Sequence, residues 1–187
     1  MTTFNTSREI PATAEEVFAA FSHPERLSRW WGPAGFTNTF SVCEFKKSGR
    51  WSFIMRGPDG RNYKNESVFA EIEHPGKIVI QHISGPKYRL TILLASSAAG
   101  TVVSWSQTFE SSEVASRIEH IVVPANEQNL DRLSVEVLHK PCENRDSSER
   151  DRFGLKMSRR EPSPNSIDVP KQNYCQDSIK CLIPIDK

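Results

Sequence analysis

Histidines and carboxylates are the side chains of this chain that could carry acid–base chemistry. His82 is one candidate, because it falls within a predicted strand and could bind a ligand or accept a proton if its ring pointed inward. A histidine in a strand is more often a core or surface residue whose hydrogen bonds are satisfied. The sequence contains no Ser-His-Asp order, Walker loop, HExxH motif or dinucleotide fingerprint. We therefore expect no catalytic residue, no cofactor and no metal site.

The cysteines offer no metal site either. Cys43, Cys142, Cys175 and Cys181 form no CxxC pair, and no histidine stands at zinc-finger spacing from a cysteine pair. Only Cys43 lies in the part of the chain with a folded pattern. A lone cysteine can serve as a nucleophile, but a small half-buried thiol is the better interpretation here.

Apolar side chains recur along several predicted elements and form a second set that could bind something. Trp51, Phe53 and Met55 share one face of a strand, and Trp30 and Trp31 stand at the end of a short helix. Such residues either line a cavity or fill the core, and core filling is the commoner use. The candidate cavity set is Trp30, Trp31, Trp51, Phe53, Met55, His82, Trp105, Leu130 and Leu133.

The composition argues against several other classes of function. A formal charge of +1 gives no electrostatic footprint for nucleic acid. The apolar runs are far shorter than the roughly 20 residues of a membrane span, so we expect no membrane insertion. Residues 1–5 lack a basic region followed by an apolar stretch, which predicts no signal peptide and a cytoplasmic protein. Nothing in the sequence predicts the oligomeric state.

The order of elements predicts an α+β domain. An edge strand over 4–10 is followed by two short helices, each with an expected capping box, Thr13 with Glu16 and Ser22 with Glu25. The last element begins near Ser112 and should be interrupted at Pro124. Six further strands with short turns lie between, at 40–45, 50–56, 65–73, 77–83, 88–95 and 101–110. We expect a curved antiparallel sheet around a long C-terminal helix, with a cavity between them.

The composition changes near Leu138, which sets the predicted domain boundary. Residues 1–138 carry the organised apolar patterns, whereas 139–187 are polar and have no amphipathic period. Such a segment cannot bury enough surface to offset its ordering entropy, so we expect a disordered tail. The tail is either an extension with a function of its own or the product of an altered reading frame.

Residues 3–138 resemble the START-like, or SRPBCC, superfamily with the helix-grip (Bet v 1-like) fold. Within it the chain is similar to the branch named for the activator of Hsp90 ATPase homologue. The resemblance is carried by short motifs in a fixed order, at 8–12, 15–18, 21–27, 30–33, 57–60, 100–101 and 129–133. One departure is the turn before Trp51, where Lys46-Lys47-Ser48-Gly49 replaces an Arg-Pro-Gly-Gly type turn.

The resemblance implies a fold more than an activity. It implies first a non-catalytic domain that binds a small hydrophobic molecule in the cavity between the sheet and the C-terminal helix. The alternative is a co-chaperone-like interaction domain whose partner is a chaperone. A cyclase- or hydrolase-like enzyme comes third, because no catalytic set stands out.

Overall fold

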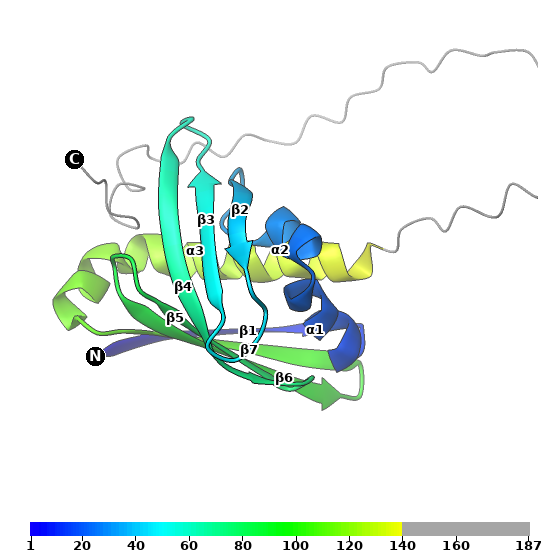
Figure 1. Cartoon of the computed structure of the whole chain (residues 1–187). Coiled ribbons are helices and arrows are strands. Elements are labelled where there is room, and N and C mark those ends of the chain that lie inside the picture. The colour runs from blue at the N-terminus through cyan, green and yellow to red at the C-terminus, as the bar shows by residue number, and fades with distance from the viewer. Residues whose placement is uncertain (140–187) are drawn as a thin grey trace, which may run out of the picture. The chain divides into compact units, whose positions relative to one another are not determined.

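Short amphipathic segments joined by tight turns fold into seven strands and three helices in the computed structural model, which describes residues 1–139 (Figure 1). Residues 140–187 of the predicted disordered tail, which begins at 139, lie outside the described residues. The elements are β1 (Thr2–Ile10), α1 (Ala14–Ser22), α2 (Pro24–Trp30), β2 (Thr37–Cys43), β3 (Arg50–Arg56), β4 (Asn62–Glu73), β5 (Lys77–His82), β6 (Tyr88–Ser97), β7 (Gly100–Phe109) and α3 (Ser112–Leu138).

The strands form one antiparallel sheet in the order β1-β7-β6-β5-β4-β3-β2. Burial alternates along β3, where Trp51, Phe53 and Met55 face the core as predicted. The pairing register shifts once between β2 and β3 and once between β4 and β5. Such bulges increase the local twist and bend, and the sheet curves around α3 (Figure 1). The predicted α+β helix-grip fold is confirmed.

Helix α3 is continuous, so the expected interruption at Pro124 is wrong. The Ser111 hydroxyl accepts a hydrogen bond from the amide of Val114 and starts the helix. Proline removes one backbone donor and crowds the preceding turn. Pro124 itself is exposed, however, and Val122 and Asn126 on either side of it are buried, so packing holds both halves in one helix. None of the helices within residues 1–139 has the length and apolar content needed to cross a bilayer.

The two short helices begin in different ways. The Thr13 hydroxyl accepts from the Glu16 amide while the Glu16 carboxylate accepts from the Thr13 amide, which confirms the first capping box. The predicted second box is wrong, because His23 is the N-cap of α2 and makes no side-chain cap. The Ser22 hydroxyl lies instead 3.1 Å from Nδ1 of His23. Pro24 starts α2 without a cap, since its fixed φ suits the first helical position.

Gly100, the first residue of β7, packs closely against the end of β1. It has φ +147°, and a Cβ there would lie 2.2 Å from the carbonyl oxygen of Ile10. Only glycine allows the two backbones to come this close. The contact fixes the β1–β7 pairing, in which Ile10 lies opposite Thr101 and Thr2 lies opposite Phe109.

Candidate ligand pocket

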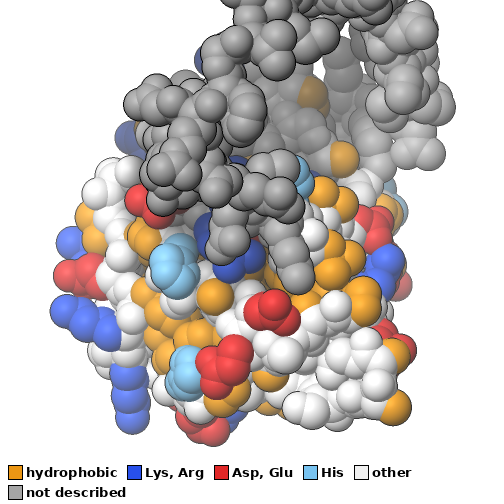
Figure 2. Space-filling view, turned by 90° about the vertical axis from the view of Figure 1, so that its right-hand side faces the viewer, with side chains coloured by type: hydrophobic (Ala, Val, Ile, Leu, Met, Phe, Trp, Pro, Cys, Tyr) orange, Lys and Arg blue, Asp and Glu red, His pale blue; other side chains and the backbone are white. Residues whose placement is uncertain are grey.

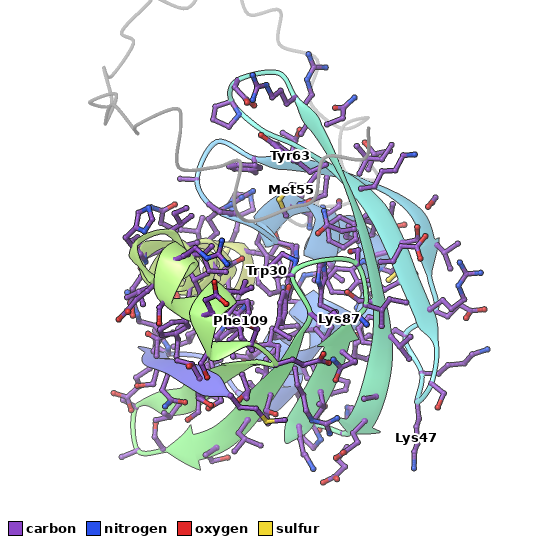
Figure 3. The ribbon with its side chains drawn as sticks, turned by 90° about the vertical axis from the view of Figure 1, so that its left-hand side faces the viewer. Trp30, Lys47, Met55, Tyr63, Lys87 and Phe109 are labelled. Atoms are coloured by element: carbon purple, nitrogen blue, oxygen red, sulfur yellow. The ribbon has the colours of Figure 1, made fainter. Side chains whose placement is uncertain are left out.

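A pocket of about 80 Å³ lies between the inner face of the sheet and the middle of α3. Met55 of β3 lines this space, and Figure 3 shows it near the top of the view, with Phe109 at the end of β7 lower down. Pro33, Tyr88 and Ala125 are only half-buried and form its rim. The lining residues are Trp31, Gly32, Pro33, Phe36, Met55, Asn65, His82, Tyr88, Leu90, Trp105, Gln107, Val122, Ala125, Asn126 and Asn129.

Four residues of the predicted cavity set line this pocket: Trp31, Met55, His82 and Trp105. They come from the end of α2 and from β3, β5 and β7, and all four are buried. The sequence alternation placed each side chain on the inner face of the sheet or at the helix end. The curvature of the sheet then brings them to one place.

The other five predicted residues, Trp30, Trp51, Phe53, Leu130 and Leu133, are buried in the adjacent core and do not line the pocket. The Trp30 indole donates to the carbonyl oxygen of Ala20 over 3.0 Å. The Trp51 ring stacks on Phe53 and Phe69, with centroids 4.8 and 5.4 Å apart. These contacts leave no open surface on either ring.

The apolar wall is built around two tryptophans. The centroids of Trp31 and Trp105 lie 5.5 Å apart, and Trp31 also packs edge-on against Trp51 at 4.7 Å. Phe36, Leu90 and Val122 complete the wall, and sequence reasoning missed all three. Leu90 could have been found from the alternation in β6. Phe36 lies in a loop, where no periodicity indicates its direction.

Buried amides form the polar part of the lining. Asn129 Oδ1 accepts from the amide of Gly32 over 2.7 Å, and Asn126 Nδ2 donates to Gln107 Oε1 over 2.9 Å. Sequence reasoning missed these residues as well. The available signal was their helical spacing, because Asn126 and Asn129 fall on the same stripe of α3 as Leu130 and Leu133. A polar residue on an apolar stripe indicates a buried hydrogen bond or a site.

His82 is held by the protein and is not poised as a base. Its Nδ1 lies 3.0 Å from the carbonyl oxygen of Pro86, and its Nε2 lies 3.1 Å from the Ser84 hydroxyl and 3.2 Å from Asn65 Oδ1. The ring stacks on Tyr88 at 4.6 Å. Burial lowers the pKa of His82, which keeps the imidazole neutral at pH 7, and burial raises the pKa of the Tyr88 phenol. Both imidazole nitrogens are therefore occupied, and neither ring brings a charge to the pocket.

One fully buried polar atom of the lining makes no hydrogen bond within residues 1–139. The Trp105 side chain is 2% exposed, and its indole Nε1 makes no hydrogen bond. No Asp, Glu, Lys or Arg belongs to the lining. Within residues 1–139, no group of three or more His, Cys, Asp or Glu side chains could hold a metal ion. The half-buried thiol of Cys43 lies outside the pocket, and burial raises its pKa to about 11.

Arg132 on α3 holds the loop that forms the rim. Its guanidinium donates to the carbonyl oxygens of Gly32 at 2.8 Å, Pro33 at 2.7 Å and Arg29 at 2.6 Å. Glu136, one turn further along α3, accepts from Arg29 and Arg26. These contacts fix the end of α2, and with it Trp31, against α3.

The face at the right of Figure 1 shows apolar side chains gathered left of its centre near two histidines, with acidic and basic groups around them (Figure 2).

A curved seven-stranded sheet that grips a long C-terminal helix, with a pocket between them, defines a helix-grip protein of the START-like superfamily. The profile of the family described as activator of Hsp90 ATPase homolog 1-like protein matches residues 11–137. The chain belongs to this family.

Solved structures show the same fold at low sequence identity. A protein of Nitrosomonas europaea aligns with a TM-score of 0.67 and 16% identity, over 72% of this chain and 93% of its own. A protein of Arthrobacter aurescens aligns with a TM-score of 0.66 and 22% identity, over 82% and 93%. An AHSA1-like protein of Aeromonas hydrophila aligns with a TM-score of 0.61 and 20% identity, over 73% and 92%. A search of curated proteins found no match.

Proposed function

We propose that this domain binds a small, mostly apolar molecule in the pocket between the sheet and α3. The observation that carries the proposal is an open space flanked by the buried side chains of Trp31, Met55 and Trp105. Apolar and aromatic walls with a few polar groups are typical of small-molecule sites. Burial of the ligand's apolar surface would supply the binding free energy.

The size of the pocket limits the ligand. Its volume of about 80 Å³ exceeds the ~10–15 Å³ that one water molecule needs. It is well below the roughly 300–1,000 Å³ of sites for drug-sized molecules. We therefore propose a compact ligand, of about one ring, that enters past the rim at Pro33 and Ala125.

The test is to fill the pocket and follow the loss of binding. Ala125→Leu adds apolar volume at the rim, whereas Ala95→Leu makes the same change on an exposed position of β6 and serves as the control. Native mass spectrometry of the purified full chain should show a co-purified small molecule, and single-ring apolar compounds should raise the melting temperature. Both effects should persist in the control and disappear in Ala125→Leu.

Two results would contradict the proposal. One is a wild-type protein without a co-purified molecule whose melting temperature no compound in a broad apolar library shifts. The other is an Ala125→Leu variant that is folded and still responds as the wild type does.

The family match favours a second candidate, a co-chaperone-like interaction domain, because the family is described by activation of the Hsp90 ATPase. Its test is the ATPase rate of purified Hsp90 with and without the full chain. Stimulation that Ala125→Leu preserves would separate this role from the pocket, and no stimulation would remove it. The occupied nitrogens of His82 do not favour a cyclase or hydrolase. The cytoplasmic location stays a prediction from the sequence.

A further inference from the structure

Gln107 of β7 and Asn126 of α3 face each other between the sheet and the helix and share one hydrogen bond, from Asn126 Nδ2 to Gln107 Oε1 over 2.9 Å. A side-chain amide carries one oxygen that accepts and one nitrogen that donates twice. Gln107 Nε2 and Asn126 Oδ1 make no hydrogen bond within residues 1–139. The pair therefore leaves one N–H donor and one carbonyl acceptor unused.

Both unused atoms can be reached from the pocket. Within residues 1–139, the fully buried side-chain atoms that lack a partner are Asn38 Oδ1 and the indole nitrogens of Trp51 and Trp105, so the two amide atoms keep accessible surface. Gln107 is 7% exposed and Asn126 is 6% exposed, and they line the pocket from its two facing walls. The little surface that they retain therefore borders this space.

The pair offers the same two groups whichever way its amides are turned. Rotating both by 180° makes Gln107 Nε2 donate to Asn126 Oδ1 and frees Gln107 Oε1 and Asn126 Nδ2, again one acceptor and one donor. Rotating only one would set two oxygens or two NH₂ groups against each other. A ligand with one donor and one acceptor matches the pair in both arrangements.

The remaining polar groups of the lining add no second amide. Asn129 and Asn65 are each bonded through both the oxygen and the nitrogen. The side chains of Trp31 and Tyr88 make no hydrogen bond within the described part of the chain. The Trp31 indole is a second donor for a ligand oxygen, and the Tyr88 hydroxyl belongs to the half-buried rim.

The charge of the ligand follows from the same lining. No Asp, Glu, Lys or Arg contributes to the pocket, and the buried His82 ring is neutral. An ionised ligand would lose its hydration without gaining a counter-charge. Unpaired polar groups beside apolar walls cost free energy, and a neutral molecule with both complementary groups removes the two costs together.

We infer that the pocket selects compact neutral rings that contain an amide group, such as lactams and cyclic imides. A small ring holds its N–H and C=O on one edge, so the N–H donates to Asn126 Oδ1 while the carbonyl accepts from Gln107 Nε2. Met55 and Leu90 contact the apolar part of the ring. The inference rests on the proposed function, to which it adds the chemical class of the ligand.

The experiment titrates the ¹⁵N-labelled full chain with 2-pyrrolidinone, γ-butyrolactone and methylenecyclopentane and follows the NMR signals. The lactone replaces only the ring N–H of the lactam by oxygen, which sets a second acceptor against Asn126 Oδ1. One net hydrogen bond corresponds to about 2–12-fold in affinity, so the lactam should bind more tightly than the lactone by about this factor. The side-chain NH₂ signals of Gln107 and Asn126 should shift with the lactam, and that of the exposed Asn62 should not move.

The double variant Gln107→Met with Asn126→Leu replaces both amides by apolar groups of similar shape, a change that can be close to neutral for stability. In this variant the preference for the lactam should disappear. Asn62→Leu, at an exposed position of β4 outside the pocket, is the matched control and should keep the preference. The affinity ratio and the NH₂ shifts are measured on the wild type, so the inference stays testable even if the double variant fails to fold.

The three rings separate the inference from the proposed function. A lactam preference that the double variant loses supports the inference. Equal binding of lactam and lactone, NH₂ signals of Gln107 and Asn126 that the lactam does not move, or a preference that the folded double variant keeps would overturn it. The proposed function still stands in these cases if any of the three rings binds and Ala125→Leu abolishes that binding. Binding of none of the three would overturn the inference and count against the proposed function as well.

Discussion

Replacing Arg132 by methionine should destabilise the protein through the loop that forms the pocket rim. The guanidinium bridges α3 to the end of α2 with hydrogen bonds of 2.6–2.8 Å to the carbonyl oxygens of Arg29, Gly32 and Pro33. Methionine keeps most of the aliphatic stem but has no donor. The last carbonyls of a helix need partners from elsewhere, and at the end of α2 Arg132 serves Arg29 while Asn38 serves Ser28.

The magnitude follows from these three bonds. A net contribution of about 0.5–1.5 kcal/mol each gives about 1.5–4.5 kcal/mol in total. The neighbouring residues Ala34 and Gly35 are exposed, so water can reach part of the freed carbonyl groups. We therefore expect a loss of about 2–3 kcal/mol in the free energy of unfolding.

Urea denaturation followed by tryptophan fluorescence measures this loss. With a slope of about 1–3 kcal/mol per molar urea, the midpoint should fall by about 1 M. Arg117→Met is the control, because Arg117 is exposed and pairs only with Glu113 on the same helix; it should cost less than about 0.5 kcal/mol. An Arg132→Met variant as stable as the control would refute the reasoning.

Two further predictions concern stability. Burial lowers the pKa of His82 below its ordinary 6.5, so the unfolded chain binds the proton more tightly. The free energy of unfolding should therefore fall as pH drops below 6.5, by at most about 1.4 kcal/mol per pH unit. His82→Gln should flatten this pH dependence, whereas replacing the exposed His120 by Gln should leave it unchanged. Gly100→Ala should lower the free energy of unfolding by about 3 kcal/mol or more, because the added Cβ would clash with the Ile10 carbonyl oxygen. Gly60→Ala should lower it by about 1 kcal/mol, because Gly60 has φ +78° but open space around it. Thermal or urea denaturation measures the free energy of unfolding for both predictions. Equal losses for Gly100→Ala and Gly60→Ala would contradict the predicted clash at Gly100.

The local elements of the fold could be predicted because their signals are local. Alternation in β3 places Trp51, Phe53 and Met55 on one face, and Thr13 with Glu16 starts α1. The predictions from the sequence were wrong where tertiary packing outweighed a local signal. Pro124 predicts a break, yet the contacts of α3 on both sides keep the helix whole.

The pocket could be predicted only in part, for a different reason. Periodicity states which face of a strand or helix a side chain occupies, but not how far that face lies from the opposite one. Trp31 and Trp51 are both buried aromatics, and nothing in the sequence says that the first meets open space and the second is stacked between rings.

The sequence by itself determined the inward faces of the sheet, the first helix cap and the resemblance to the helix-grip proteins. Only the tertiary structure decided which inward residues enclose a space, that Asn126 and Asn129 contribute to it, and that the Trp105 donor is unpaired. The physical reason is that a cavity is a difference between the volume enclosed by the curved sheet and α3 and the volume of the side chains that fill it. That difference depends on curvature, register and rotamers together, and none of these is a property of a single segment of the chain.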